Sequence, residues 1–192
     1  GAQVRTFHAA ALRQLRFFWP QLSRTAFPEL MSSKASIVAR SLAHCNVDSD
    51  KALVRDVSGD IEWSKSNMMD SALIHKAKRD FAIDVATLAK VMDSYETLKK
   101  DRNLLDFDDI LMLMSAAIRT RPDIQSAVHS AYRWFTVDEF QDVNPLQKSV
   151  LDLWIGERDD ICVVGDPSQT IYSFTGASSK YLTDFVKTYP NS

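Results

Sequence analysis

Two adjacent carboxylates, Asp138 and Glu139, directly follow an aromatic and β-branched run at residues 134–137. Such a run favours a β-strand, so the two acids are expected at its C-terminal tip. Neighbouring carboxylates repel each other, and the pair therefore favours a cation or a proton between them. Hard oxygen ligands suit Mg²⁺, which typically binds one or two carboxylates together with phosphates. The pattern predicts Asp138 on the metal and Glu139 on an attacking water, with solvated acids at a strand end as the simpler alternative.

A second short apolar run, residues 161–164, leads into Gly165 and Asp166. The run is again typical of a buried strand, and the glycine permits a tight turn. Gln169 follows, and its neutral side chain is suited to sensing a terminal phosphate or its water. Together the two runs predict acids and amides at the ligand-binding edge of an open α/β sheet.

Two aromatic residues, Tyr172 and Phe174, come next without helical or strand periodicity, so we expect them on a loop. Aromatic rings on a loop beside a phosphate site can stack on nucleic-acid bases, and such stacking tolerates any base sequence. The alternative is that both rings pack under their own loop.

The element between the two runs must position them. Asn144 and Pro145 are typical first residues of a helix, and apolar residues at 146, 150, 153 and 154 give that helix a face to bury. A strand, a helix and a strand at this spacing predict a right-handed βαβ unit with parallel strands. Both polar tips then lie at the same edge of the sheet.

Three stretches resemble motifs of one enzyme family. Residues 138–144, Asp-Glu-Phe-Gln-Asp-Val-Asn, resemble motif II of superfamily 1A DNA helicases, the UvrD, Rep and PcrA family. Residues 165–177 resemble motif III, and their ending Ser-Phe-Thr-Gly-Ala is most similar to the actinobacterial UvrD-like branch. Residues 6–8, Thr-Phe-His, are similar to motif Ib.

The resemblance implies that Asp138 helps to bind Mg²⁺, that Glu139 activates water, and that Gln169 joins in catalysis by coupling the γ-phosphate of ATP to DNA. It implies coupling roles for Gln141, Asp142 and Asp166. It places four residues near single-stranded DNA, namely Thr6, His8, Tyr172 and Phe174. Thr6 is equally suited to cap a helix, and a histidine beside a helix start is often a structural hydrogen-bonding group.

The same resemblance divides the chain into three segments. Residues 1–19 and 103–192 are expected to be parts of a RecA-like domain 1A, and residues 20–102 are expected to form the helical 1B subdomain. The predicted fold class is therefore α/β and mostly helical, a partial RecA-like parallel sheet layer with an inserted α-helical subdomain.

Local signals predict the helices of the N-terminal half. Pro20 is expected to end the first helix, and the Val-Ser-Gly-Asp stretch at 57–60 is expected to break another. Residues 70–81 are expected to be helical. Residues 84–102 form the most regular pattern, and the basic residues near its end are expected to complement the helix dipole: Lys99, Lys100 and Arg102.

Three acids, Asp106, Asp108 and Asp109, mark the start of a further helix. Asp106 is a good N-cap, and acids in a first turn suit the helix dipole. A metal site is the alternative for such a trio. The helix start explains the pattern more simply.

Composition describes an ordinary globular chain, with 23 basic and 25 acidic residues and a formal net charge of −2. The first 47 residues nevertheless carry six basic residues against one acid, which suits either a phosphate-facing surface or a solvated helix face. Two distant cysteines favour a reducing cytosol over a disulfide scaffold. With no long apolar run and no signal peptide expected, the prediction is a cytoplasmic, nucleoid-associated protein without a membrane partner.

The five glycines of the chain are each followed by a residue other than lysine, so the Gly-Lys-Ser/Thr ending of a phosphate loop is absent from these 192 residues. We therefore expect an excerpt of a helicase that uses ATP and Mg²⁺ to move 3′ to 5′ on single-stranded DNA, and that is inactive as this chain alone. Expected partners are single-stranded DNA, single/double-strand junctions and DNA-repair proteins. An exposed sheet edge predicts a dimer of the fragment.

Two other functions fit the same sequence. The helical segment at 20–102 can be a binding module for DNA or for a repair protein, without a catalytic role. The chain can also be a helicase-like domain of a nuclease complex.

Overall fold

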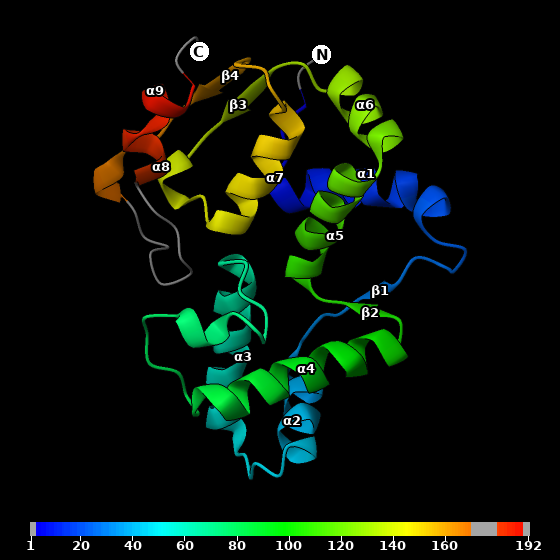
Figure 1. Cartoon of the computed structure of the whole chain (residues 1–192), viewed down its shortest axis with the longest axis vertical. Helices are drawn as coiled ribbons and strands as arrows, with labels where there is room; N and C mark the ends of the chain where they lie inside the picture. Colours follow the sequence, from blue (N-terminus) through cyan, green and yellow to red (C-terminus); the bar gives the residue numbers. More distant parts are fainter. Residues whose placement is uncertain (1–2, 170–179, 190–192) are drawn as a thin grey trace. The chain divides into compact units, whose positions relative to one another are not determined.

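The chain folds into two units, which are described separately because their relative placement is not defined (Figure 1). The computed structural model describes residues 3–169 and 180–189. Unit 1 comprises Gly1–Thr25 and Ile110–Ser192, and unit 2 comprises Ala26–Asp109. The two boundaries, after Thr25 and after Asp109, each lie a few residues beyond the boundaries expected after residues 19 and 102. The assignment of the segments to RecA-like domain 1A and subdomain 1B stays a prediction.

Helices dominate both units, which confirms a mostly helical α/β chain. Unit 1 contains, in chain order, α1 (Phe7–Leu22), α5 (Phe107–Thr120, whose first turn belongs to unit 2), α6 (Pro122–Ala131), β3 (Phe135–Val137), η2 (Phe140–Asp142), α7 (Pro145–Ile155), β4 (Ile161–Val163), η3 (Pro167–Gln169), α8 (Lys180–Thr183) and α9 (Phe185–Thr188). Among the described residues, no helix combines the length and the apolar character needed to cross a bilayer.

The predicted βαβ unit is confirmed in unit 1. Strands β3 and β4 pair in parallel, with Phe135 opposite Ile161. Asn144 caps α7 through a reciprocal capping box, in which the Gln147 N–H donates to Asn144 Oδ1 at 2.8 Å and the Asn144 N–H donates to Gln147 Oε1 at 3.1 Å. Trp134, expected in the first strand, lies just before it and is 79% exposed.

Trp154 anchors the core of unit 1. Its ring stacks between those of Phe7 on α1 and Phe135 on β3, with centroid distances of 5.9 and 6.2 Å. Its indole N–H donates to Gln14 Oε1 at 2.8 Å, which satisfies the polar end of a buried aromatic side chain. The helix α1 is thereby fixed against the strand that carries the acids.

The helix α1 begins as predicted but ends later. Thr6 Oγ1 accepts the Ala9 N–H at 3.2 Å, so Thr6 is the N-cap. The prediction that Pro20 ends the helix is wrong, because the helix continues to Leu22. The last turn closes beyond the proline, because the Ser23 N–H donates to the Trp19 carbonyl at 2.9 Å.

Unit 2 is built from three helices that share one core (Figure 1). Its elements are β1 (Glu29–Leu30), α2 (Ala35–His44), α3 (Lys51–Ser66), η1 (Ile74–Lys76), α4 (Val85–Asp101) and β2 (Leu104–Leu105). The buried core residues are Ile37, Val38, Leu42, Val57, Ile61, Ile74, Leu88, Val91, Met92 and Tyr95. The predicted helix at 84–102 is confirmed within one residue at either end.

The predicted break at residues 57–60 is wrong, because α3 runs through Gly59 without interruption. Val57 and Ile61 lie on either side of the glycine and are both buried in the core. The free energy gained by burying this face outweighs the roughly 1 kcal/mol helix penalty of one glycine.

The predicted helix at residues 70–81 is also wrong, since only the short turn η1 forms there. The buried carboxylate of Asp60 holds this segment against α3 by accepting the Ala82 N–H at 2.8 Å and the Arg79 guanidinium at 3.0 Å. The Arg79 guanidinium also lies over the Trp63 ring at 4.7 Å. These long-range contacts replace the local bonds of a helix.

The two ends of unit 2 lie side by side as a short parallel ribbon of β1 and β2. The Glu29 N–H donates to the Asn103 carbonyl at 3.0 Å, and the Met31 N–H donates to the Leu105 carbonyl at 2.8 Å. The chain therefore enters and leaves unit 2 at neighbouring points.

The start of α5 is a reciprocal cap, as the sequence predicts. The Asp109 N–H donates to Asp106 Oδ1 at 3.0 Å, and the Asp106 N–H donates to Asp109 Oδ2 at 2.8 Å. Both carboxylates are buried. A cap made of two buried acids requires positive charge nearby.

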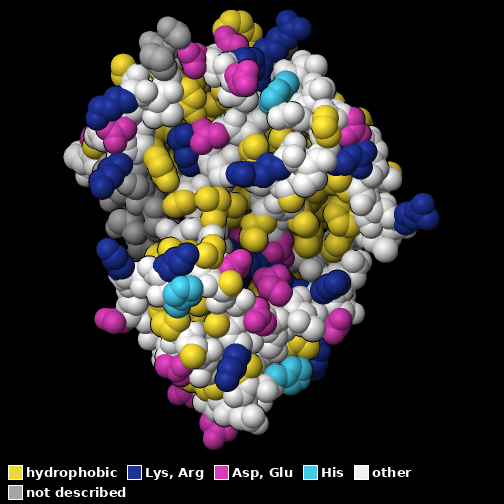
Figure 2. Space-filling view, in the orientation of Figure 1, with side chains coloured by type: hydrophobic (Ala, Val, Ile, Leu, Met, Phe, Trp, Pro, Cys, Tyr) yellow, Lys and Arg dark blue, Asp and Glu magenta, His cyan; other side chains and the backbone are white. Residues whose placement is uncertain are grey.

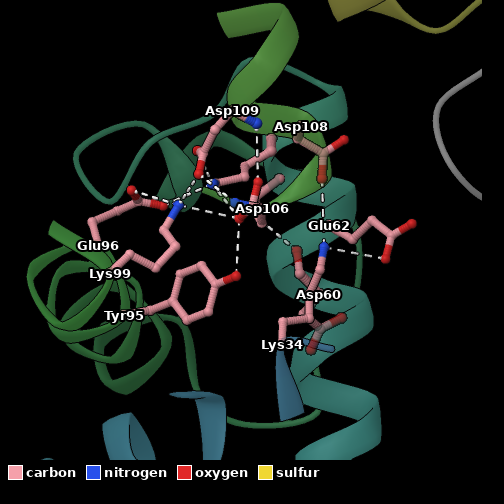
Figure 3. A network of polar contacts seen from close by, with 11 residues as sticks. Lys34, Asp60, Glu62, Tyr95, Glu96, Lys99, Asp106, Asp108 and Asp109 are labelled. Atoms are coloured by element: carbon pink, nitrogen blue, oxygen red, sulfur yellow. Dashed lines mark hydrogen bonds and ion pairs between the residues drawn. The ribbon is translucent and has the colours of Figure 1, made fainter. Parts of the chain in front are cut away.

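Two buried lysines, Lys65 and Lys99, supply that charge. Figure 3 shows Lys99 among Glu96, Asp106 and Asp109. Lys65 Nζ lies 2.6 Å from oxygens of both Asp106 and Asp109, and Lys99 Nζ contacts the same two carboxylates. The Tyr95 hydroxyl donates to Asp106 Oδ2 at 2.9 Å. Lys99 lies in the last turn of α4, as expected, but it is only 2% exposed and contacts buried acids, which the sequence did not indicate.

The lysines account for the charge state of the cluster. Burial raises the pKa of Asp106, but Lys65 and Lys99 outweigh burial and hold that pKa well below its usual range. Glu96, at 2.8 Å from Lys65 and 2.9 Å from Lys99, completes the cluster. Oxygens of Glu96, Asp106 and Asp109 lie within 4.8 Å of one another, and the two ammonium groups offset two of the three negative charges.

We expect Lys65→Met to lower the free energy of unfolding by about 3 kcal/mol, because it leaves two buried carboxylates with a single lysine. Chemical denaturation of the chain measures the loss. Lys90→Met, at an exposed lysine on α4, is the matched control and should stay within about 0.5 kcal/mol. Equal effects of the two substitutions would contradict a stabilising role for the cluster.

Asp108, beside the cluster, predicts a pH dependence. Burial raises the pKa of Asp108 to about 6, although Lys34 Nζ at 3.5 Å opposes the rise. Between about pH 4 and about pH 6 the folded chain then holds a proton that the unfolded chain has released, so stability falls as the pH rises through this window.

Asp108→Asn replaces this carboxyl with a group that does not ionise, and so removes the loss of stability at rising pH. At neutral pH the variant should be more stable than the wild type by on the order of 2 kcal/mol, and the gain should vanish as the pH falls to about 4. Thermal or chemical unfolding across this range measures the difference. A difference that is independent of pH would contradict the assignment.

Candidate functional site

The predicted site residues meet at the C-terminal edge of the β3–β4 pair. Asp138 and Glu139 follow β3 directly, and Asp166 and Gln169 follow β4 after a short turn. All four side chains are exposed. The edge can therefore present carboxylates and an amide to a ligand in solvent, which is where ligands bind in open α/β sheets.

Backbone bonds continue the pairing of the strands into the two loops. The Val164 N–H donates to the Val137 carbonyl at 2.8 Å, and the Phe140 N–H donates to the Val164 carbonyl at 2.9 Å. Phe140 is fully buried beneath the loops. The acids thus sit on a backbone that is held from both strands.

Glu139 turns the chain sharply after β3. Its backbone is left-handed, with φ 51° and ψ 42°, a conformation that costs a non-glycine residue roughly 1 kcal/mol or more. Asp138 Oδ1 accepts the Glu139 N–H at 2.9 Å, and the turn η2 begins at the next residue. The strained turn therefore ends the extended backbone of β3 directly before η2.

Gln141 connects the two loops through its side-chain amide. Its Nε2 donates to Glu139 Oε2 at 2.6 Å, and its Oε1 accepts the Asp166 N–H at 3.1 Å. The residue is 1% exposed. A buried amide with both ends bonded fixes the spacing of the groups that it joins.

Asp166 organises the turn after β4. Its Oδ1 accepts the Ser168 N–H at 2.9 Å and the Ser168 hydroxyl at 2.7 Å, while its Oδ2 accepts the Gln169 Nε2 at 2.9 Å. These bonds from Ser168 and Gln169 lower the pKa of the Asp166 carboxyl. The carboxylate stays ionised and holds Gln169 at the edge.

Gly165 is required for a reason that the sequence does not reveal. A Cβ atom there would lie 2.3 Å from Gln141 Oε1 and 3.1 Å from the Phe140 nitrogen. The glycine is thus needed for the close approach of the two loops, and its φ angle is not in the left-handed region. Sequence reasoning attributed it to a tight turn alone.

The residues expected at DNA lie at the start of α1 or outside the described residues. Thr6 and His8 are on the first turn of α1, where Thr6 serves as the N-cap. Burial lowers the pKa of His8 to about 4, so its ring is neutral at neutral pH. Tyr172 and Phe174 lie outside the described residues. Asp142, for which the resemblance implies a coupling role, is the last residue of the turn η2.

Basic side chains on the face seen in Figure 2 are interspersed with acids. No single-sign field of Lys and Arg covers the described part of that face. A phosphate-facing surface formed by the basic residues of the first 47 therefore stays a prediction.

Comparison with known proteins decides the family. A model of the UvrD/REP helicase N-terminal domain matches residues 1–190. The chain belongs to the UvrD/Rep helicase family. The resemblance that motifs II and III indicated is thereby confirmed.

Similar proteins carry helicase names. The chain is 43% identical to the ATP-dependent DNA helicase UvrD2 of Mycobacterium tuberculosis, over 98% of this chain and 28% of that protein. It is 30% identical to the ATP-dependent DNA helicase PcrA of Leuconostoc citreum, over 98% and 25%, and 27% identical to PcrA of Staphylococcus aureus, over 97% and 26%. The chain thus spans about a quarter of the length of these relatives.

We expect Gly165→Ala to lower the free energy of unfolding by about 1–3 kcal/mol, because the new methyl group forces Gln141 away and strains the loops. Gly59→Ala is the matched control, since a Cβ there meets nothing within 4 Å and the alanine favours helix α3. It should raise stability by about 0.5–1 kcal/mol. Urea unfolding of both variants gives the comparison, and two changes of the same sign would contradict the close approach.

Proposed function

We propose that this chain supplies the motif II and motif III part of the nucleotide site of a longer, ATP-dependent DNA helicase that moves 3′ to 5′ on single-stranded DNA. One observation carries the proposal. The parallel pairing of β3 and β4 brings Asp138, Glu139, Asp166 and Gln169 to one exposed edge. The helicase relatives support the nature of the ligand.

The donor set fits Mg²⁺ bound to a nucleotide. Asp138 and Glu139 offer hard carboxylate oxygens in solvent, and Mg²⁺ takes one or two such ligands besides phosphate oxygens. When bound, the ion neutralises phosphate charge and orients the terminal phosphate. Asp138, whose Oδ1 is fixed by the Glu139 N–H, would be its protein ligand.

Glu139 is proposed as the general base for the attacking water. Gln141 holds its Oε2 at 2.6 Å, which leaves Oε1 to accept a proton from water. Gln169, held by Asp166 on the neighbouring loop, is suited to reach the terminal phosphate or that water. The loop after β3 would thus carry the general base, and the loop after β4 would carry the group that senses the phosphate.

The phosphate cradle must come from outside these 192 residues, because none of the five glycines begins a Gly-Lys pair. We therefore infer that the chain by itself does not turn over ATP. DNA would be held by stacking on Tyr172 and Phe174 and by basic groups of the N-terminal quarter. Single strands and single/double-strand junctions, as in DNA repair, are the proposed substrates.

We expect Glu139→Gln in the full-length protein to lower kcat for DNA-stimulated ATP hydrolysis by about 10²–10⁴-fold, since the amide cannot accept the proton. The affinity for Mg-ATP should change by less than about threefold, because binding does not need the base. Steady-state hydrolysis and fluorescent-nucleotide titration measure the two.

Glu157→Gln is the control, because Glu157 is an exposed acid in the segment before β4, away from the C-terminal edge. It should leave both quantities unchanged. Parallel loss of hydrolysis and binding in Glu139→Gln would rule out Glu139 as the base. Unchanged hydrolysis would favour the binding-module function for the chain.

A further inference from the structure

We propose that Gln141 is a positioning residue that links the loop after β4 to the catalytic orientation of Glu139. The inference rests on the proposed function and deepens it. It assigns to the buried amide the task of transmitting the position of the Asp166–Gln169 turn to the general base. Gln141 itself touches no reacting atom in this assignment.

An unbroken series of hydrogen bonds joins the two ends. Gln169 Nε2 donates to Asp166 Oδ2 at 2.9 Å, the Asp166 N–H donates to Gln141 Oε1 at 3.1 Å, and Gln141 Nε2 donates to Glu139 Oε2 at 2.6 Å. The residues come from the loops of both strands. Every group in the series lies within the described residues.

The orientation of the Gln141 amide is fixed from both sides. The Asp166 N–H can only donate, so it must meet the amide oxygen. The Glu139 carboxylate can only accept, so it must meet the amide nitrogen. A flipped amide would lose both bonds at once, and the two neighbours therefore select one orientation independently.

The surroundings leave the amide little freedom to move. Gln141 is 1% exposed, and the neighbouring Phe140 is fully buried. Gly165 approaches so closely that even one methyl group there would overlap Gln141 Oε1. A shift of the β4 loop must therefore move the amide, because close-packed groups transmit displacement instead of absorbing it.

Glu139 is the end of this series that is able to respond. Its backbone is strained and left-handed, and its side chain is exposed apart from the bond to Gln141. Loss of that bond would free the carboxylate to leave the orientation in which it can take a proton. A small misplacement of a catalytic group costs large factors in rate.

The test compares two variants of the full-length protein, Gln141→Met and Gln141→Glu. Gln141→Met keeps the length of the side chain and removes both hydrogen bonds. It should lower kcat for DNA-stimulated ATP hydrolysis by at least about tenfold, with KM for ATP within about threefold, because positioning acts on the transition state and not on binding. A merely structural role would instead change both constants or the amount of folded protein.

Gln141→Glu adds a readout that packing cannot imitate. Its oxygen can still accept the Asp166 N–H, but its other oxygen faces the Glu139 carboxylate. Two carboxylates in contact repel each other, so this variant loses the bond to Glu139 while it keeps the bond to the Asp166 N–H. Its kcat for ATP hydrolysis should fall at least as far as that of Gln141→Met, with KM for ATP within about threefold, which assigns the effect to the bond with Glu139.

Asp84→Ala is the control for general destabilisation, because it removes the N-cap of α4, which lies outside both motifs, without touching the series of bonds. It should leave kcat within about twofold. The inference is overturned if Gln141→Met keeps its kcat, or if Gln141→Glu hydrolyses ATP with the kcat of the wild type. Those outcomes leave the proposed function intact, which fails separately if Glu139→Gln retains hydrolysis.

Discussion

Parallel pairing of β3 with β4 is the constraint on which the site depends. Two parallel strands need a crossover, and the crossover helix α7 returns the chain so that both strands end at the same edge. Each strand has only three residues, so its own pairing is weak. Trp154 on α7 compensates by stacking on both Phe135 and Phe7, which makes the position of the acids a property of the whole unit.

The features that sequence could predict are those with local causes. Asn144 before Pro145 and Asp106 before Asp109 specify helix starts through bonds that span three residues. The runs before Asp138 and Asp166 specify strands because they are rich in β-branched and aromatic residues. The family resemblance, which the comparisons confirm, likewise rests on short contiguous motifs that can be read without the fold.

The features that sequence missed depend on partners far away in the chain. Pro20 and Gly59 are weak local signals that tertiary packing overrides. Lys99 has the spacing of a surface lysine, and only the acids at 106 and 109 explain why it is buried. Gln141 and Gly165 are 24 residues apart, and neither residue alone indicates that the amide oxygen of one occupies the place of a side chain on the other.

The ribbon of β1 and β2 has an evolutionary consequence. Neighbouring strands lie about 4.8 Å apart, so the segment between residues 26 and 109 leaves the host chain almost where it entered. An insertion with such closely spaced ends imposes little strain on the polypeptide that surrounds it, whatever its own size. Changes of length or sequence inside this segment can therefore accumulate without displacing the residues on either side of it.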